Sequence, residues 1–214
     1  MLKLYANPIS PFAQRVMLFL EEAKIPHEHV MLRAGDLQKE PFTKVSTFHT
    51  VPAIELDGFT MTESLAILRY LAQRYQNSAW YPENLEDRAR IDQVMDYGES
   101  IAKPLMVLGK ELAMAPRLGK ATNFAKVEDL RSDLLKYLPR FEAYIAGRSF
   151  AVGAAPTIAD IALTPFLHMY KYANMAMTDF PEAKAYADRM IERPAMKKVL
   201  ATVEQAFRNW NKGS

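Results

Sequence analysis

The hydrophobic positions change their spacing near residue 80 of the 214-residue chain. Before that point, helical patterns alternate with short apolar runs, which are typical of strands, at residues 2–6, 27–32, 51–56 and 59–62. After it, almost every apolar stripe has helical spacing. The pattern therefore predicts an α/β layered unit followed by an all-helical part.

Two amphipathic helices and a hairpin are predicted within the first part. Apolar residues recur at helical spacing over residues 11–23 and again over residues 65–75. Asp57-Gly58 separates the last two strand-like runs and is a strong hairpin signal, because a type I′ turn requires positive φ at both central residues. The predicted order of elements is β-α-β-x-β-β-α.

The second part is predicted to be a helical bundle. The first long stripe contains Pro104, where we expect a kink. The apolar stripes cover residues 91–112, 127–145, 157–172, 182–192 and 194–210. We expect one domain over residues 1–78 and a second over residues 86–214.

Composition and charge exclude several classes of function. The chain has no cysteine, which excludes disulfides, cysteine-bound zinc and a cysteine nucleophile, and we expect no metal. Its net charge of +2 is too small to indicate a nucleic-acid partner. The N-terminal residues lack the apolar stretch of a signal peptide, and no charge-free run approaches the ~20 residues of a membrane span. A soluble, cytoplasmic protein is expected.

Ser10-Pro11-Phe12 stands where the first predicted strand meets the first predicted helix. The simplest interpretation is helix capping, because serine is favoured at the N-cap and proline at the first helical position. The same position would place the Ser10 hydroxyl at the positive end of a helix, where a bound thiolate is stabilised. The two interpretations are compatible.

Two further motifs have both a structural and a functional interpretation. Val51-Pro52 opens a strand, where proline is tolerated, and a cis bond there would leave the Val51 backbone free to pair with an extended peptide. Thr62-Glu63-Ser64 precedes a helix, so Thr62 or Ser64 could cap it. The motif could also hold the charged head of an amino acid, with Ser64 and backbone N–H groups on the carboxylate and Glu63 on the ammonium.

Taken together, these motifs resemble a known family. SPFAQRV near residue 10, VPAIELDG near residue 51 and TESLAILRYL near residue 62 are similar to the thioredoxin-like domain of the cytosolic glutathione transferase superfamily. PTIADIAL at residues 156–163 resembles the helix-capping signature of its helical domain, with Thr157 and Asp160 as a capping-box pair. The SPF motif with its following arginine is most similar to the tau and omega classes and to bacterial serine-type members. The resemblance implies a thioredoxin-like N-terminal domain and an all-helical C-terminal domain.

The resemblance also implies a role for each motif. Ser10 would donate a hydrogen bond to the glutathione sulfur. Val51 would bind the cysteinyl backbone beside a cis Pro52. Glu63 and Ser64 would hold the γ-glutamyl group.

The glycyl end of such a site departs from the family pattern. The residues that generally hold the glycyl carboxylate are replaced here by Leu37, Ser46, Thr47 and Thr50. Lys39, His49 or Gln38 would substitute for them, although a solvated loop also accounts for Lys39.

The implied activity is that of a glutathione transferase, with glutathione as co-substrate, a small hydrophobic electrophile as its partner and a homodimer as the assembly. Lowering the thiol pKa by about two units from about 8.5 would make the thiolate the main form at neutral pH. Without cysteine the chain forms no mixed disulfide with glutathione, which favours conjugation or addition. The candidate residues for an electrophile pocket between the domains are Phe12, Tyr97, Ser100, Lys103 and Met106.

The sequence leaves alternatives open. Tyr5 and Asn7 lie near Ser10 in the chain and could contact the sulfur, although strand packing and turn initiation are the simpler accounts. The fold could also act without catalysis. It would then be an interaction protein like the stringent-starvation protein, which binds RNA polymerase, or a carrier of hydrophobic ligands.

Overall fold

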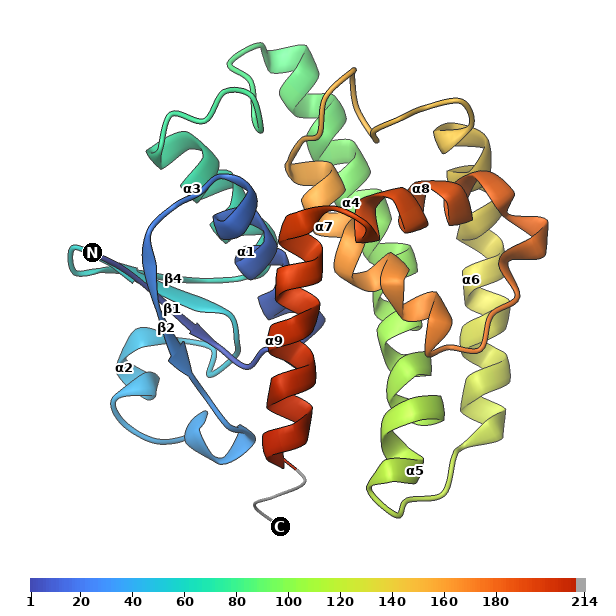
Figure 1. Ribbon diagram of the computed structural model, residues 1–214, viewed down its shortest axis with the longest axis horizontal. Coiled ribbons are helices and arrows are strands. Elements are labelled where there is room, and N and C mark those ends of the chain that lie inside the picture. Colours follow the sequence, from blue (N-terminus) through green and yellow to red (C-terminus); the bar gives the residue numbers. More distant parts are fainter. Residues whose placement is uncertain (211–214) are drawn as a thin grey trace. The chain divides into compact units, whose positions relative to one another are not determined.

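The first part of the chain forms the predicted mixture of strands and helices in the computed structural model, which describes residues 1–210 (Figure 1). Its elements are β1 (Leu2–Ala6), α1 (Pro11–Glu22), β2 (His27–Met31), a 3₁₀ turn (Ala34–Asp36), α2 (Phe42–Val45), β3 (Ala53–Leu56), β4 (Phe59–Thr62) and α3 (Ser64–Arg74). The predicted order is confirmed, and the segment between β2 and β3 contains the short helix α2.

The four strands form one mixed sheet in the order β2-β1-β3-β4. β1 pairs parallel with β2 and antiparallel with β3, and β3 pairs antiparallel with β4. The hairpin prediction is confirmed, because Asp57 and Gly58 between β3 and β4 have φ values of 52° and 84°.

Helices cover both faces of this sheet. Figure 1 shows α1 and α3 on one side and α2 on the other. On the α2 side, Tyr5 and Ala53 pack with Phe42, and the rings of Tyr5 and Phe42 lie 6.2 Å apart. Leu4 and Ile54 alternate with them along the strands and are fully buried on the opposite face. The sheet is therefore buried on both sides at its centre.

The second part of the chain is helical throughout its regular elements. They are α4 (Leu85–Gly109), a π-helical segment η2 (Lys110–Met114), α5 (Ala115–Arg117), α6 (Phe124–Ile145), α7 (Ile158–Leu167), the 3₁₀ segments η3 (His168–Lys171) and η4 (Met177–Asp179), α8 (Pro181–Ile191) and α9 (Pro194–Trp210). The helix predicted over residues 157–172 thus ends as an α-helix at Leu167 and continues as η3. Among the helices of residues 1–210, none is long and apolar enough to cross a membrane.

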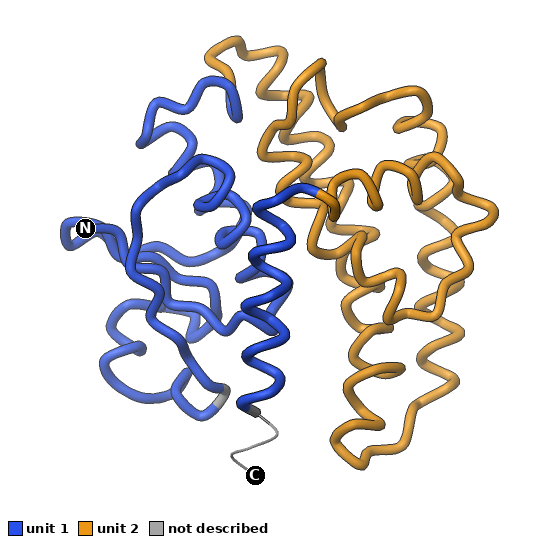
Figure 2. The backbone as a smooth tube through the Cα atoms, in the orientation of Figure 1, with its two compact units in different colours: residues 1–81, 193–214 blue, residues 82–192 orange. Residues whose placement is uncertain are grey.

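Contacts divide the chain into two compact units (Figure 2). Among the described residues, one unit contains residues 1–81 and 193–210, and the other contains residues 82–192. α9 belongs to the first of these units because it packs on α1. Two hydrogen bonds of 2.5 and 2.8 Å join the Arg193 guanidinium to the Glu22 carboxylate, and Lys198 Nζ lies 2.7 Å from Glu21 Oε2. The division into domains of residues 1–78 and 86–214 stays a prediction.

A buried carboxylate organises the start of α7. Thr157 is the N-cap and forms the predicted capping box with Asp160, which is 0% exposed. The Asp160 carboxylate accepts hydrogen bonds from the backbone N–H groups of Ala151 and Thr157, both at 2.8 Å, and from the Tyr186 hydroxyl at 2.7 Å. Burial raises the pKa of Asp160, and these hydrogen bonds oppose the rise. This network joins α7, α8 and the segment that precedes α7.

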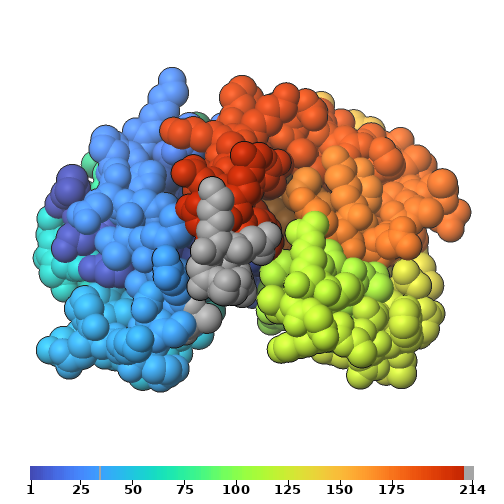
Figure 3. Space-filling model, turned by 60° about the horizontal axis from the view of Figure 1, so that its bottom comes forward, coloured from blue at the N-terminus to red at the C-terminus, as the bar shows by residue number. Residues whose placement is uncertain are grey.

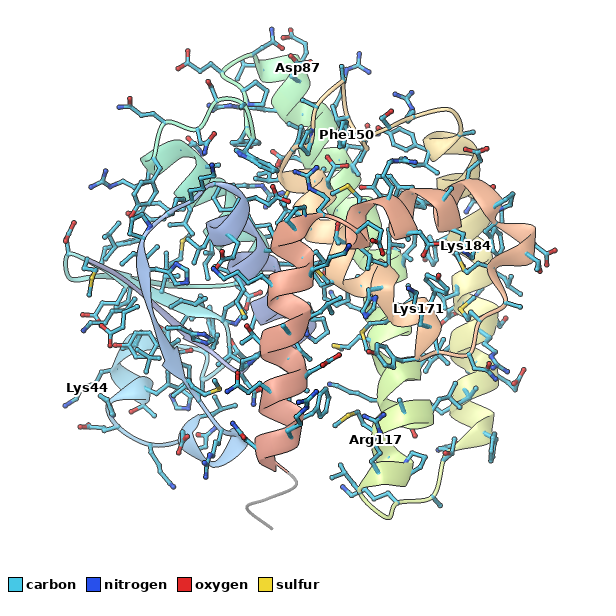
Figure 4. All side chains as sticks on the ribbon, in the orientation of Figure 1. Lys44, Asp87, Arg117, Phe150, Lys171 and Lys184 are labelled. Atoms are coloured by element: carbon cyan, nitrogen blue, oxygen red, sulfur yellow. The ribbon has the colours of Figure 1, made fainter. Side chains whose placement is uncertain are left out.

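His168, the first residue of η3, is a buried histidine. It is 9% exposed, its ring lies 5.4 Å from that of Tyr172, and its Nδ1 has no hydrogen-bond partner among the described residues. Burial lowers the pKa of His168 to about 4; the charge of Lys171 lowers it further and that of Asp188 opposes this. Asp188 itself contacts Lys184 at 2.6 Å and Lys171 at 3.9 Å (Figure 4 labels both lysines).

This buried histidine predicts a loss of stability in weak acid. The unfolded chain takes up a proton at His168 near pH 6.5, whereas the folded chain does so only near pH 4. As the pH falls from 7.5 to 5, the free energy of unfolding should therefore drop by about 2 kcal/mol through this residue. Urea unfolding of the parent and of His168→Phe, each at pH 7.5 and pH 5, measures this drop, which the variant should lack. The same decrease in both proteins would contradict the prediction.

Candidate active site

The sheet register brings the three motifs of the first unit to one edge. Tyr5 of β1 pairs with Ala53 of β3, and Ala53 pairs with Thr62 of β4. Because β3 runs antiparallel to both neighbours, the end of β1, the start of β3 and the end of β4 lie side by side. The loop after β1, the peptide before β3 and the residues after β4 therefore all meet at this edge. We call it the motif edge.

Ser10 occupies the N-cap position of α1, with Pro11 as the first helical residue. Its side chain makes no capping hydrogen bond, so the capping interpretation holds for its position but not for its hydroxyl. Backbone contacts fix the loop instead, since Ser10 N–H donates to the Asn7 carbonyl at 2.9 Å. The hydroxyl is left unused by the helix, at the positive end of the helix dipole.

Tyr5 and Asn7 have structural roles. The Tyr5 hydroxyl donates to Glu55 Oε2 at 2.7 Å, and burial together with this hydrogen bond raises the pKa of Tyr5 to about 12. Its ring packs on Phe42, on the α2 side of the sheet. Asn7 Oδ1 accepts a hydrogen bond from Ile9 N–H at 3.0 Å, which is turn formation. The Tyr5 hydroxyl and the Asn7 side chain are therefore both engaged within the fold.

The Val51-Pro52 peptide bond is cis, as the family resemblance implies. The paired residues of β3 begin at Ala53, so Val51 lies outside the ladder. The Val51 side chain packs against the hydrophobic cluster that contains Tyr5 and Phe42. The sheet core thus anchors the side chain, and the backbone of this residue lies at the motif edge.

Glu63 and Ser64 start α3 in an unusual conformation. Glu63 is the N-cap with φ of 69° and makes no side-chain capping bond, so the prediction that Thr62 or Ser64 caps this helix is wrong. A non-glycine residue with positive φ costs about 1–3 kcal/mol, and such strain is concentrated at functional sites. Ser64, 5% exposed, accepts a hydrogen bond from Arg15 Nη1 at 3.2 Å.

The charges at the motif edge favour an anionic ligand. α1 and α3, of 12 and 11 residues, both begin there, and a helix N-terminus attracts negative charge. The guanidinium of Arg15 is buried behind them, 5.4 Å from the centre of the Phe12 ring. In the part of the chain that the structure describes, no three His, Asp or Glu side chains form a group that could hold a metal ion.

The segment proposed for the glycyl end lies at the surface of the first unit, in light blue in Figure 3. His49 has φ of 52°, and its Nδ1 lies 2.9 Å from Gln38 Oε1. Lys39, which is exposed, follows Gln38 in the sequence and therefore lies near His49. All three substitute residues predicted for the glycyl carboxylate therefore lie in one neighbourhood.

Two of the replaced family positions have structural roles here. Leu37 packs against the Tyr5 cluster. The Ser46 hydroxyl closes the following loop, because it bonds to Thr50 N–H at 3.0 Å and to the Thr50 carbonyl at 3.1 Å. Nothing in the structure explains the residue at Thr47.

The candidate electrophile residues come from both units. Phe12 is in α1, and the others are in α4. The Tyr97 hydroxyl donates to the Tyr137 carbonyl of α6 at 2.9 Å, and Lys103 Nζ lies 3.7 Å from Glu99. Tyr97 therefore has a packing role between α4 and α6, whichever ligand it meets. Ser100 and Met106 are partly buried in α4.

Sequence reasoning missed two residues that contact the site. Gln14 and Arg15 are buried in α1 although they lie outside the apolar positions that predicted this amphipathic helix. Gln14 Nε2 donates to the Pro8 carbonyl at 2.9 Å, and Arg15 contacts Ser64. No local pattern marks their burial, because polar residues outside an apolar helical stripe are ordinarily exposed to solvent.

Comparisons with known proteins find matches to both parts of the chain. Residues 4–79 match the glutathione S-transferase N-terminal domain, and residues 101–194 match the corresponding C-terminal domain. The chain is 30% identical to glutathione S-transferase 4 of Zea mays over 205 residues, which cover 92% of this chain and 91% of the maize protein.

Solved structures extend the likeness to the whole fold. Glutathione transferase F7 from Populus trichocarpa is 27% identical with a TM-score of 0.84, and the match covers 95% of this chain and 99% of that one. Glutathione S-transferase-I bound with lactoylglutathione is 25% identical with a TM-score of 0.83, covering 94% and 98%. The predicted thioredoxin-like domain followed by a helical domain is confirmed. The chain belongs to the glutathione S-transferase family.

Proposed function

We propose that this protein is a glutathione transferase that binds glutathione at the motif edge and activates its thiol through Ser10. One observation carries the proposal: the loop of Ser10, the Val51 backbone outside the β ladder and the strained Glu63 meet where three strand ends adjoin. Each residue type matches one part of a γ-glutamyl tripeptide. None of the three takes part in the strand pairing of the sheet, and neither Ser10 nor Glu63 caps its helix with its side chain.

The residues at the motif edge fit the ligand chemically. Ser64 and the N–H groups at the start of α3 suit the γ-glutamyl carboxylate, and the Glu63 carboxylate suits the ammonium. The Val51 backbone, which lies outside the β ladder, suits the cysteinyl peptide group. Lys39 suits the glycyl carboxylate, with His49 and Gln38 beside it.

Glutathione supplies the reactive thiol. Ser10 stabilises the thiolate form with its hydroxyl hydrogen and with the N-terminus of α1, and the thiol proton passes to solvent. Two pKa units correspond to about 2.7 kcal/mol, which these two interactions together can provide. The activated sulfur then forms a bond to an electrophilic carbon; a leaving group departs with its electron pair, or the adjacent carbon of a double bond takes up a proton.

We assign small hydrophobic electrophiles as the second substrates. Phe12, Tyr97, Lys103 and Met106 stay the candidates for contacting them, and the tau- or omega-like bacterial serine-type subclass stays a prediction from the SPF motif. The non-catalytic alternatives are not proposed. A scaffold or a ligand carrier has no use for an uncommitted Ser10 hydroxyl next to a strained Glu63.

We further propose a cytoplasmic homodimer. Phe48, on the loop between α2 and β3, is 67% exposed and offers an apolar contact to a second copy. Sedimentation that returned only the monomer mass at micromolar concentration would contradict this assembly.

The function is tested by titrating the purified protein with glutathione. We expect saturable binding in the micromolar to millimolar range, accompanied at pH 7 by thiolate absorbance that free glutathione lacks. S-methylglutathione should compete for binding without producing that absorbance, because it has no thiol proton. A protein that binds neither compound at millimolar concentration is not the enzyme proposed.

A further inference from the structure

Two consecutive polar side chains on the buried side of α1 are unusual for an amphipathic helix. Gln14 is 7% exposed and Arg15 is 1% exposed. A buried amide or guanidinium is unfavourable unless it is hydrogen-bonded, so such residues are retained where their contacts matter. Both contacts lead to the motif edge, and they lead to different ends of it.

Gln14 holds the loop that carries Ser10. Its Nε2 donates to the Pro8 carbonyl at 2.9 Å, and its backbone N–H donates to the Ser10 carbonyl at 3.0 Å. The Gln14 side chain therefore holds the loop at Pro8, and the Gln14 backbone holds it at Ser10. Removing the side-chain amide would leave the helix intact and remove the hydrogen bond to the Pro8 carbonyl.

Arg15 holds the start of α3. Its Nη1 donates to Ser64 Oγ at 3.2 Å, across 49 positions of the sequence. A serine hydroxyl has one hydrogen to donate and two lone pairs that accept. Because Arg15 occupies a lone pair, the Ser64 hydrogen is directed to another acceptor, as a bound carboxylate requires.

We propose that Gln14 and Arg15 are positioning residues for separate ends of the glutathione site, Gln14 for Ser10 at the thiol end and Arg15 for Ser64 at the γ-glutamyl end. Neighbouring residues of an α-helix point about 100° apart, so the two contacts diverge and can be changed independently. The proposal rests on the proposed function and adds that one helix sets thiol activation and head-group affinity through different side chains.

Gln14→Leu tests the thiol end, because leucine has a similar size and no amide. We expect the thiol pKa of bound glutathione to rise by about one unit, from about 6.5 to about 7.5, which leaves about threefold less thiolate at pH 7. Affinity for S-methylglutathione should change by less than about threefold. The matched control is Gln73→Leu on α3, an exposed glutamine whose amide bonds only weakly, at 3.4 Å, to Arg69. Gln14→Met replaces Gln14→Leu if urea unfolding shows that leucine disrupts the fold.

Arg15→Lys tests the γ-glutamyl end, because lysine keeps the charge but loses the fork of nitrogen donors. We expect affinity for S-methylglutathione to fall by about tenfold, with the thiol pKa of the saturated complex moving by less than about half a unit. Arg74→Lys, at the exposed end of α3, is the matched control. In a Ser64→Ala background the part of the Arg15→Lys effect that depends on the Arg15–Ser64 hydrogen bond should disappear.

The proposal requires that each variant change one quantity and leave the other unchanged. A Gln14 variant that changes only the thiol pKa, with an Arg15 variant that changes only the affinity, supports it. Parallel losses of both quantities in both variants overturn it, and so do variants indistinguishable from the parent. A parent protein that binds neither glutathione nor S-methylglutathione overturns the proposed function itself, which the parent titration alone reveals.

Discussion

Replacing Asp160 with alanine should lower the free energy of unfolding by about 4 kcal/mol. The carboxylate is 0% exposed and receives backbone hydrogen bonds from Ala151 and Thr157 and a side-chain bond from Tyr186. Alanine would leave these donors buried without an acceptor, at about 1–3 kcal/mol for each. The losses overlap because these donors all converge on one carboxylate, so we expect less than their sum.

Urea unfolding followed by circular dichroism measures this loss. Asn123→Ala is the matched control, because Asn123 caps α6 through a single hydrogen bond of 3.1 Å to Lys126 N–H and the bond is exposed. An exposed cap is worth about 1 kcal/mol. If the two variants lose similar amounts, the buried network contributes no more than an ordinary cap, and the interpretation of Asp160 fails.

The parts of the fold that were predicted correctly depend on interactions between near neighbours in the chain. Thr157 and Asp160 are three positions apart, and their capping chemistry is complete within one helical turn. Asp57 and Gly58 determine the hairpin from their own φ values. Helices and strands with regular apolar spacing were found for the same reason, since period and propensity are local properties.

The parts that were missed depend on contacts between distant positions. Arg193 binds Glu22 across 171 positions, and this pair places α9 against α1. The link from Tyr186 to Asp160 and the link from Arg15 to Ser64 are equally invisible to a local pattern. The end of α7 was misjudged because apolar spacing continues through η3, while the backbone tightens from α-helical to 3₁₀ geometry.

The candidate site shows the same division. The family resemblance supplied the positions of Ser10, Val51 and Glu63, whereas the register of the sheet supplied the reason that they meet. Glutamate is a poor choice for positive φ on local grounds, so the φ of 69° at Glu63 had no sequence signal. The absence of a capping hydrogen bond from the Ser10 side chain also had no sequence signal, because serine before proline ordinarily indicates an N-cap whose hydroxyl bonds to the helix.

Replacing Ser10 with alanine should reduce the rate of conjugation at pH 7 by about ten- to twentyfold. Without the hydroxyl the thiol pKa rises from about 6.5 toward its ordinary value of about 8.5, so the thiolate fraction at pH 7 falls from about three quarters to less than about a tenth. The fold should lose less than about 1 kcal/mol, because the Ser10 side chain makes no capping hydrogen bond. A large effect on rate with a small effect on stability distinguishes activation of the thiol from a structural role.

The pH profile makes this test specific to the thiol. The conjugation rate of the parent should level off near neutral pH. The rate of Ser10→Ala should keep rising until about pH 9, where thiolate is abundant without the hydroxyl. At that pH the rates of the two proteins should become similar. Ser132→Ala, at an exposed position of α6, is the matched control and should follow the parent throughout. A Ser10→Ala protein with the parent's profile and the parent's thiolate absorbance would show that another group stabilises the sulfur. The N-terminus of α1 would then have to supply the whole shift of about 2.7 kcal/mol, several times what a helix dipole provides at a partly exposed site.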